Sequence, residues 1–232
     1  MKKMLKLGMF LLMFSGYIHP IDIEVLPHKV SLGDVFVVRV FEKDKINLTI
    51  GKSTFPTFIS NDRKFRQVIL GVPSWWKAGR YPVFINGEEA NISLEIIRKE
   101  FPTQEIKIAP EKVIENEETK KQREIIFKKI LTKTEEKIWK GKFIIPVEGR
   151  ITTDFGMKRK VNNETRGYHK GIDISANTGT IIKASNEGVV KKGQTMAKVG
   201  ATGLATGAHL HWGMYIFGVD VNPLNFINNL YD

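Results

Sequence analysis

The glycine-rich stretch at residues 200–212, G-A-T-G-L-A-T-G-A-H-L-H-W, ends in two histidines, His209 and His211, separated by one residue. Upstream, the motif H-K-G-I-D places His169 and Asp173 four positions apart. Side chains at i and i+2, or at i and i+4, point to the same face of a β-strand, so each pair can converge on one point. Imidazoles and a carboxylate suit zinc, and three protein ligands leave a fourth position for water, as in catalytic zinc sites. The two motifs therefore predict a catalytic metal site built on strands.

The order of these motifs resembles that of the lysostaphin/LytM-type zinc metallopeptidases, which cut peptide bonds in bacterial peptidoglycan. The matching segments are residues 149–156 (G-R-I-T-T-D-F-G), 169–173 and 203–211. The resemblance implies a metallopeptidase-type domain over residues 141–232, an antiparallel β domain of the LytM type with a barrel-sandwich hybrid-like fold. It also implies a zinc endopeptidase that acts on the peptide cross-links of peptidoglycan.

The resemblance further implies which residues form the site. His169, Asp173 and His211 would bind zinc, and His209 would be a catalytic residue that assists the attacking water or stabilises the transition state. In the family, several strands between an A-x-x-x-G-x-V segment and a K-x-G-Q segment carry a second catalytic histidine. Here Val190 runs directly into the K-K-G-Q segment, and no histidine lies between His169 and His209. We therefore predict an internal deletion that leaves the ligand set complete and removes one catalytic group, a loss that typically lowers a rate by about 10²–10⁴-fold.

Short strands separated by glycine are predicted along the rest of this second domain. The predicted strands are Phe143–Pro146, Ile151–Thr153, Gly171–Ser175, Thr180–Ala184, Gly188–Val190, Gln194–Val199 and His209–Ile216. Their pattern favours a mostly antiparallel arrangement.

Residues 20–98 also read as a run of short strands, which predicts an Ig-like β-sandwich as an accessory domain. The alternation of apolar and polar residues at 21–25 is typical of a half-buried strand, and Asn86-Gly87 is a hairpin signal because both residues tolerate positive φ. The predicted strands are Ile21–Val25, Val35–Phe41, Ile46–Ile50, Phe65–Leu70, Tyr81–Asn86 and Asn91–Ile97.

Between the two β domains, residues 99–140 are predicted to be a linker that contains an amphipathic helix. The segment Glu117–Lys140 is highly charged and lacks proline and glycine, and its apolar residues at 127, 131 and 138 share one helical face. Asn116 is the expected N-cap. The chain as a whole is thus predicted to be mainly β, with one linking α-helix.

The N-terminal residues 1–19 combine three early lysines with an apolar run, which is the pattern of a secretory signal peptide or of an uncleaved anchor. The protein is accordingly expected to be exported to the periplasm, cell envelope or extracellular space, with membrane contact only through this segment. The chain has 232 residues, no cysteine and a net charge of +11, which excludes disulfides and thiolate metal sites and favours polyanionic surroundings such as the cell wall. The charge alone does not choose among nucleic acid, anionic lipid and cell-wall polymer, and no motif for nucleic-acid binding accompanies it; the resemblance implies peptidoglycan as the partner.

Two alternatives to the peptidase hypothesis stay open at this stage. A non-catalytic relative that binds peptidoglycan, or that regulates a partner hydrolase, is supported by the missing second histidine. A biotinyl/lipoyl-type carrier domain is suggested by the short strands around residues 188–194, with Lys191 or Lys192 as the attachment point. The carrier reading leaves the three-ligand set unexplained.

Overall fold

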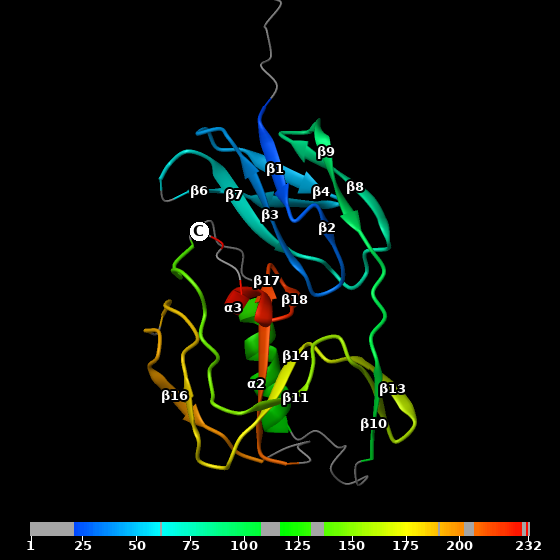
Figure 1. Cartoon of the computed structure of the whole chain (residues 1–232), viewed down its shortest axis with the longest axis vertical. Helices are drawn as coiled ribbons and strands as arrows, with labels where there is room; N and C mark the ends of the chain where they lie inside the picture. The colour runs from blue at the N-terminus through cyan, green and yellow to red at the C-terminus, as the bar shows by residue number, and fades with distance from the viewer. Residues whose placement is uncertain are drawn as a thin grey trace, which may run out of the picture.

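A computed structural model describes residues 21–60, 62–107, 117–130, 137–189, 191–201, 207–228 and 231. Figure 1 shows two groups of strands stacked along the long axis, with β1 to β9 in the upper group and β11 to β18 in the lower one. The predicted signal peptide or anchor, residues 1–19, lies outside the described residues. The mainly β class expected from the sequence is confirmed.

Two sheets make up the upper group. One sheet has the order β1 (Ile23–Leu26), β3 (Val35–Val40), β7 (Arg66–Gly71), β6 (Phe58–Ile59). The other has the order β2 (Lys29–Val30), β9 (Glu88–Ile96), β8 (Gly79–Ile85), β4 (Asn47–Ile50), β5 (Ser53–Pro56). Buried residues of both sheets, such as Phe36 and Leu48, share one core, so the sheets pack face to face. The Ig-like topology stays a prediction.

Strand β3 is buried on both faces, which explains its sequence V-F-V-V-R-V, apolar at every position except Arg39. Alternate residues of a strand point to opposite faces. Phe36 and Val38 therefore fill the core between the two sheets, whereas Val35 and Val37 belong to a second cluster with Val221 of the lower domain. The outer face of this sheet is thus the surface on which the second domain packs.

All six strands predicted in the upper domain are found, with ends that differ by at most three residues. The predicted turn at residues 86–87 joins β8 to β9, with φ of 51° at Asn86 and 91° at Gly87. The additional strands β2, β5 and β6 have two to four residues each. Such short segments carry too little periodicity to be predicted from sequence.

The lower domain is built around a sheet with the order β11-β14-β17-β18. Its strands are β11 (Arg150–Thr153), β14 (Gly171–Ser175), β17 (His209–Ile216) and β18 (Val219–Val221). Strands β12 (Lys158–Val161) and β13 (Glu164–Tyr168) form a hairpin, and β15 (Ile181–Lys183) pairs with β16 (Thr195–Lys198). A short helix, α3 (Leu224–Asn228), follows β18. All pairs within this lower domain are antiparallel, as expected.

Two of the strands predicted in this domain are wrong. Residues 143–146 are joined to residues 183–185 by two single bonds, in which Ile144 N–H donates to Ser185 O and Lys183 N–H donates to Pro146 O, and no ladder forms. Gly188 and Val189 lie in a bend, and Val190 is outside the described residues. The β-branched residues there favour a strand, but Gly188 and Val189 belong to the connection between β15 and β16.

The linking segment differs from its prediction at both ends. Residues Thr103–Ile106 form a strand, β10, that pairs in parallel with β12. Helix α2 spans Glu117–Ile130, and residues 137–140 are not helical because the Trp139 ring packs instead on Phe143 and Phe226. Asn116 and residues 131–136 lie outside the described residues. Neither α2, with 14 residues, nor α3, with 5, is long and apolar enough to cross a membrane.

The two domains interlock through glycines of the upper one. A Cβ at Gly33 would overlap the Phe155 ring, and a Cβ at Gly71 would overlap the Val221 side chain. Phe155 and Val221 are 5% and 0% exposed, so these side chains have no room to move aside. The upper domain therefore presents two backbone hollows that receive side chains of the lower domain.

The hollow at Gly33 gives a stability prediction with a matched control. Gly33 and Gly87 both have positive φ, of 84° and 91°, so alanine at either position carries a similar backbone strain of about 1 kcal/mol. Only at Gly33 does the new methyl group meet a buried ring, since nothing lies within 4 Å of a Cβ at Gly87. We expect Gly33→Ala to lower the free energy of unfolding by about 1–3 kcal/mol more than Gly87→Ala. Urea unfolding measures the difference, and equal effects of the two substitutions would contradict the interlock.

Candidate metal centre

Strands β14 and β17 place the predicted site residues on one face of the central sheet. Asp173 lies directly opposite His211, and Ser175 lies directly opposite His209. Residues opposite one another in an antiparallel pair point to the same face, and so do residues two apart along a strand. The H-x-H spacing therefore brings both histidines to the side of the sheet that carries Asp173.

His169 reaches the same point from the segment just before β14. Its backbone N–H donates to Met157 O, and its carbonyl accepts from Gly156 N–H, both at 2.8 Å. The ring Nδ1 lies 3.0 Å from Asp154 O, and because a carbonyl can only accept, Nδ1 carries the proton and donates it. This bond fixes the orientation of the ring, with Nε2 facing Asp173 Oδ1 at 3.0 Å, and leaves Nε2 as the nitrogen that could bind a metal ion.

The donor atoms of His169, Asp173 and His211 form a compact triangle. His169 Nε2 lies 2.9 Å from His211 Nδ1, and each of these nitrogens lies 3.0 Å from Asp173 Oδ1. Donor atoms around a tetrahedral zinc ion are about 3.3 Å apart. The triangle therefore needs to expand by only a few tenths of an ångström to hold such an ion, and its two nitrogens and one oxygen are zinc-type donors. These residues fit a bound metal ion.

Two glycines make room for the His211 ring. Gly171 and Gly213 lie opposite each other, one on β14 and one on β17. A Cβ at Gly171 would lie 2.9 Å from His211 Cε1, and a Cβ at Gly213 would lie 3.5 Å from His211 Nε2. The glycine in H-K-G-I-D thus gives His211 the space to turn its Nδ1 toward Asp173.

Asp173 has a further partner that the sequence analysis missed. Arg159 Nη2 lies 2.8 Å from Asp173 Oδ2, on the oxygen that does not face the histidines. Burial tends to raise the pKa of Asp173, but hydrogen bonds from His169 and His211, together with the charges of His169 and Arg159, outweigh it and hold the pKa well below its usual range. Asp173 is therefore a carboxylate at neutral pH. The signal for Arg159 was weak, because an arginine among basic residues in K-R-K reads as surface charge.

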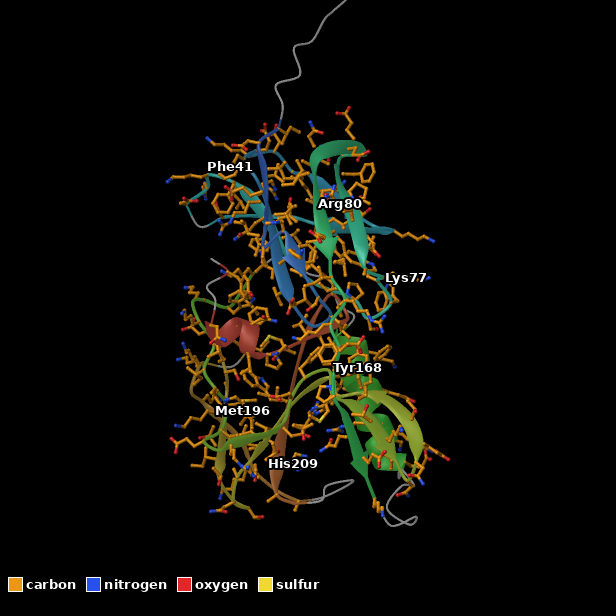
Figure 2. The ribbon with its side chains drawn as sticks, turned by 45° about the vertical axis from the view of Figure 1, so that its right-hand side comes forward. Phe41, Lys77, Arg80, Tyr168, Met196 and His209 are labelled. Atoms are coloured by element: carbon orange, nitrogen blue, oxygen red, sulfur yellow. The ribbon has the colours of Figure 1, made fainter. Side chains whose placement is uncertain are left out.

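His209 lies beside the triangle but outside it. Its Nε2 is 4.0 Å from Asp173 Oδ1, and His209 is not among the residues whose donor atoms cluster within 4.8 Å. Its Nδ1 donates to Gly207 O at 2.8 Å, which leaves Nε2 of the neutral ring as an acceptor. Figure 2 labels His209 near the lower end of the domain, where β17 begins.

Another polar pair, half-buried Tyr168 and buried Asp220, lies on the side of the site toward the upper domain. Tyr168 donates its hydroxyl proton to Asp220 Oδ2 at 2.7 Å, joining β13 to β18. Burial, and then this hydrogen bond, raise the pKa of Tyr168 above its usual value. The tyrosine therefore stays neutral. Because Tyr168 directly precedes His169, its bond to Asp220 connects the backbone next to His169 to the central sheet.

Comparison with known proteins agrees with this fold. No family model matches the sequence, and no curated protein matches it. A crystal structure described as that of a candidate M23 peptidase from Pseudomonas aeruginosa is similar, with a TM-score of 0.60 and 19% identity over 85% of this chain and 94% of that chain. The match is too long to fall within one domain, so the likeness extends over both.

The fold is therefore like that of M23 peptidases, the class that includes the lysostaphin/LytM type. The resemblance found in the sequence is confirmed in its fold. The internal deletion stays a prediction.

Proposed function

We propose that this chain is a zinc metalloendopeptidase that cleaves peptide cross-links of bacterial peptidoglycan. The observation that carries the proposal is the convergence of His169, Asp173 and His211 on one point of a sheet with an M23-like fold. A bound metal ion can activate water and polarise a carbonyl, and a histidine acceptor beside it can assist proton transfer, so this arrangement suits metal-assisted peptide hydrolysis.

Each residue of the site has a separate task in this proposal. His169 Nε2, Asp173 Oδ1 and His211 Nδ1 would hold zinc, which when bound lowers the pKa of a water molecule and polarises the scissile carbonyl. Asp154 O keeps His169 in the binding tautomer. His209 Nε2, free to accept a proton, would take it from the attacking water and deliver it to the leaving amine.

An open polar groove runs beside the site and supports a peptide substrate. It is lined by Glu148, Gly149, residues 175–178, Thr180 and Ala208. Ser175 is the residue opposite His209 and Ala208 directly precedes it, so two lining residues of the groove neighbour the proposed catalytic histidine. The net charge of +11 favours an anionic polymer such as the cell wall as the larger substrate.

The direct test is release of soluble muropeptides from purified peptidoglycan by the protein, with and without a zinc chelator. We expect release that stops when the chelator is added and returns when zinc is restored. Hydrolysis that persists in excess chelator would contradict a metal-dependent mechanism.

A second function, binding of peptidoglycan without cleavage, is favoured by one observation. Apart from the two ligands His169 and His211, the described residues offer one histidine at the site, His209, because His28 lies in the upper domain. The second catalytic histidine expected from the family resemblance is therefore not found among them. A binding protein of this kind would sediment with insoluble peptidoglycan and release nothing. In both cases we propose that the protein is exported, with residues 1–19 as signal peptide or anchor.

A further inference from the structure

The two carboxylate oxygens of Asp173 have different partners, and Arg159 is the partner of one of them. Oδ1 faces His169 and His211 at 3.0 Å, whereas Oδ2 accepts a hydrogen bond from Arg159 at 2.8 Å. The Asp173 side chain is 10% exposed, so water offers little alternative to this partner. Fixing Oδ2 prevents the carboxylate from rotating and keeps Oδ1 aimed at the point where the three donors meet.

The Arg159 side chain has a neighbour on the interdomain strand. Gln104 of β10 lies directly beside Arg159 of β12 in the parallel register, so the two side chains share one face. Gln104 Oε1 and Arg159 Nε are both buried, and neither has a hydrogen-bond partner in the described part of the chain. One atom can only accept and the other can only donate. Because neighbouring strands are about 4.8 Å apart, the two side chains lie next to each other, one with an unpaired acceptor and the other with an unpaired donor.

Strand β10 is held against β12 over its whole length. Pro102 O accepts from Lys158 N–H at 2.9 Å, and the Phe101 ring fills the space where Gly156 lacks a Cβ. On the opposite face from Arg159, Glu105 lies 3.8 Å from Lys160, and Glu100 lies 3.8 Å from Lys158. In Figure 1 the chain descends from β9 of the upper domain directly into β10 at the side of the lower domain. The linker is thus part of the wall behind the metal centre.

We propose that Arg159 is a positioning residue that orients Asp173 for metal binding, and that Gln104 of the interdomain strand in turn holds Arg159. The inference rests on the proposed metal site and adds a coupling between that site and the segment that joins the two domains. Displacement of β10 would release Arg159 and loosen the grip of Asp173 on the metal.

The direction of the change in zinc affinity distinguishes a positioning role of Arg159 from a purely electrostatic one. A guanidinium near a bound zinc ion repels it, so removal of the charge alone would strengthen zinc binding. Loss of an outer partner that orients a ligand instead weakens metal affinity, typically by about 10–100-fold. Positioning therefore predicts a weaker zinc affinity for Arg159→Gln.

The experiment measures zinc affinity of the full chain by competition with a chromophoric chelator, together with the urea midpoint of the metal-free protein. We expect Arg159→Gln to weaken zinc affinity by about 10–100-fold, Arg159→Lys to restore part of it, and Gln104→Leu to weaken it by about 10-fold. The control is Lys160→Gln, on the same strand but on the opposite face, which should leave the affinity unchanged. The urea midpoints of Arg159→Lys and Gln104→Leu should stay near that of the control.

Each outcome decides a different part of the inference. Unchanged or tighter zinc binding in Arg159→Gln overturns the positioning role, and unchanged binding in Gln104→Leu overturns the coupling to β10. Weaker binding that follows a lowered urea midpoint in every variant would show a purely structural role. If the unaltered protein binds no zinc, the proposed function itself fails.

Discussion

Replacement of His211 by alanine is expected to abolish both zinc binding and chelator-sensitive hydrolysis. His211 supplies one of three donor atoms, and a triangle reduced to His169 and Asp173 cannot hold zinc with an open fourth position. Loss of a ligand should weaken zinc affinity by more than the 10–100-fold that is typical when a residue hydrogen-bonded to a ligand is lost. Zinc content after dialysis and muropeptide release are the two measurements.

The control for this variant is His28→Ala. His28 is an exposed histidine of the upper domain, so its loss tests for nonspecific binding of zinc to imidazoles. The His211 side chain is 45% exposed, so its truncation leaves no closed cavity and the fold should persist. Zinc bound in a one-to-one ratio by the His211→Ala protein would contradict the assigned ligand set.

Replacement of His209 by alanine is expected to separate chemistry from metal binding. His209 Nε2 is 4.0 Å from Asp173 and outside the donor triangle, so the variant should retain its zinc. Removal of a positioned proton-transfer group lowers the rate by about 10²–10⁴-fold, so muropeptide release should fall by that factor. The measurements are zinc content and the rate of release at saturating zinc. Loss of zinc would make His209 a ligand, and an unchanged rate would remove it from the mechanism.

The parts of the fold that the sequence predicted well are those whose pattern is local. Strands β14 and β17 begin and end as expected because glycine and histidine motifs mark their limits. The C-terminal end of helix α2 was predicted too far along the chain. The apolar periodicity of the sequence continues to Ile138, but the Trp139 ring packs on Phe226 in the folded protein. Local propensity yields to such packing.

The parts that the sequence did not predict depend on contacts between distant residues. Strand β10 has the unremarkable sequence T-Q-E-I, and it becomes a strand because β12, more than fifty residues later, pairs with it. Arg159 likewise becomes part of the site only when the β12–β13 hairpin lies against Asp173. The candidate donors could be found from their spacing, whereas the groups that orient them required the tertiary structure.

The backbone hollows at Gly33 and Gly71 limit how the two domains of this protein can be recombined with domains of other proteins. A lower domain transferred to another host would carry the Phe155 ring and the Val221 side chain without the glycines that receive them. It would also lose β10, which belongs to the chain that arrives from the upper domain. Domain shuffling would therefore have to move residues 21–107 together with the lower domain, and the two parts are expected to be inherited as one unit rather than as exchangeable modules.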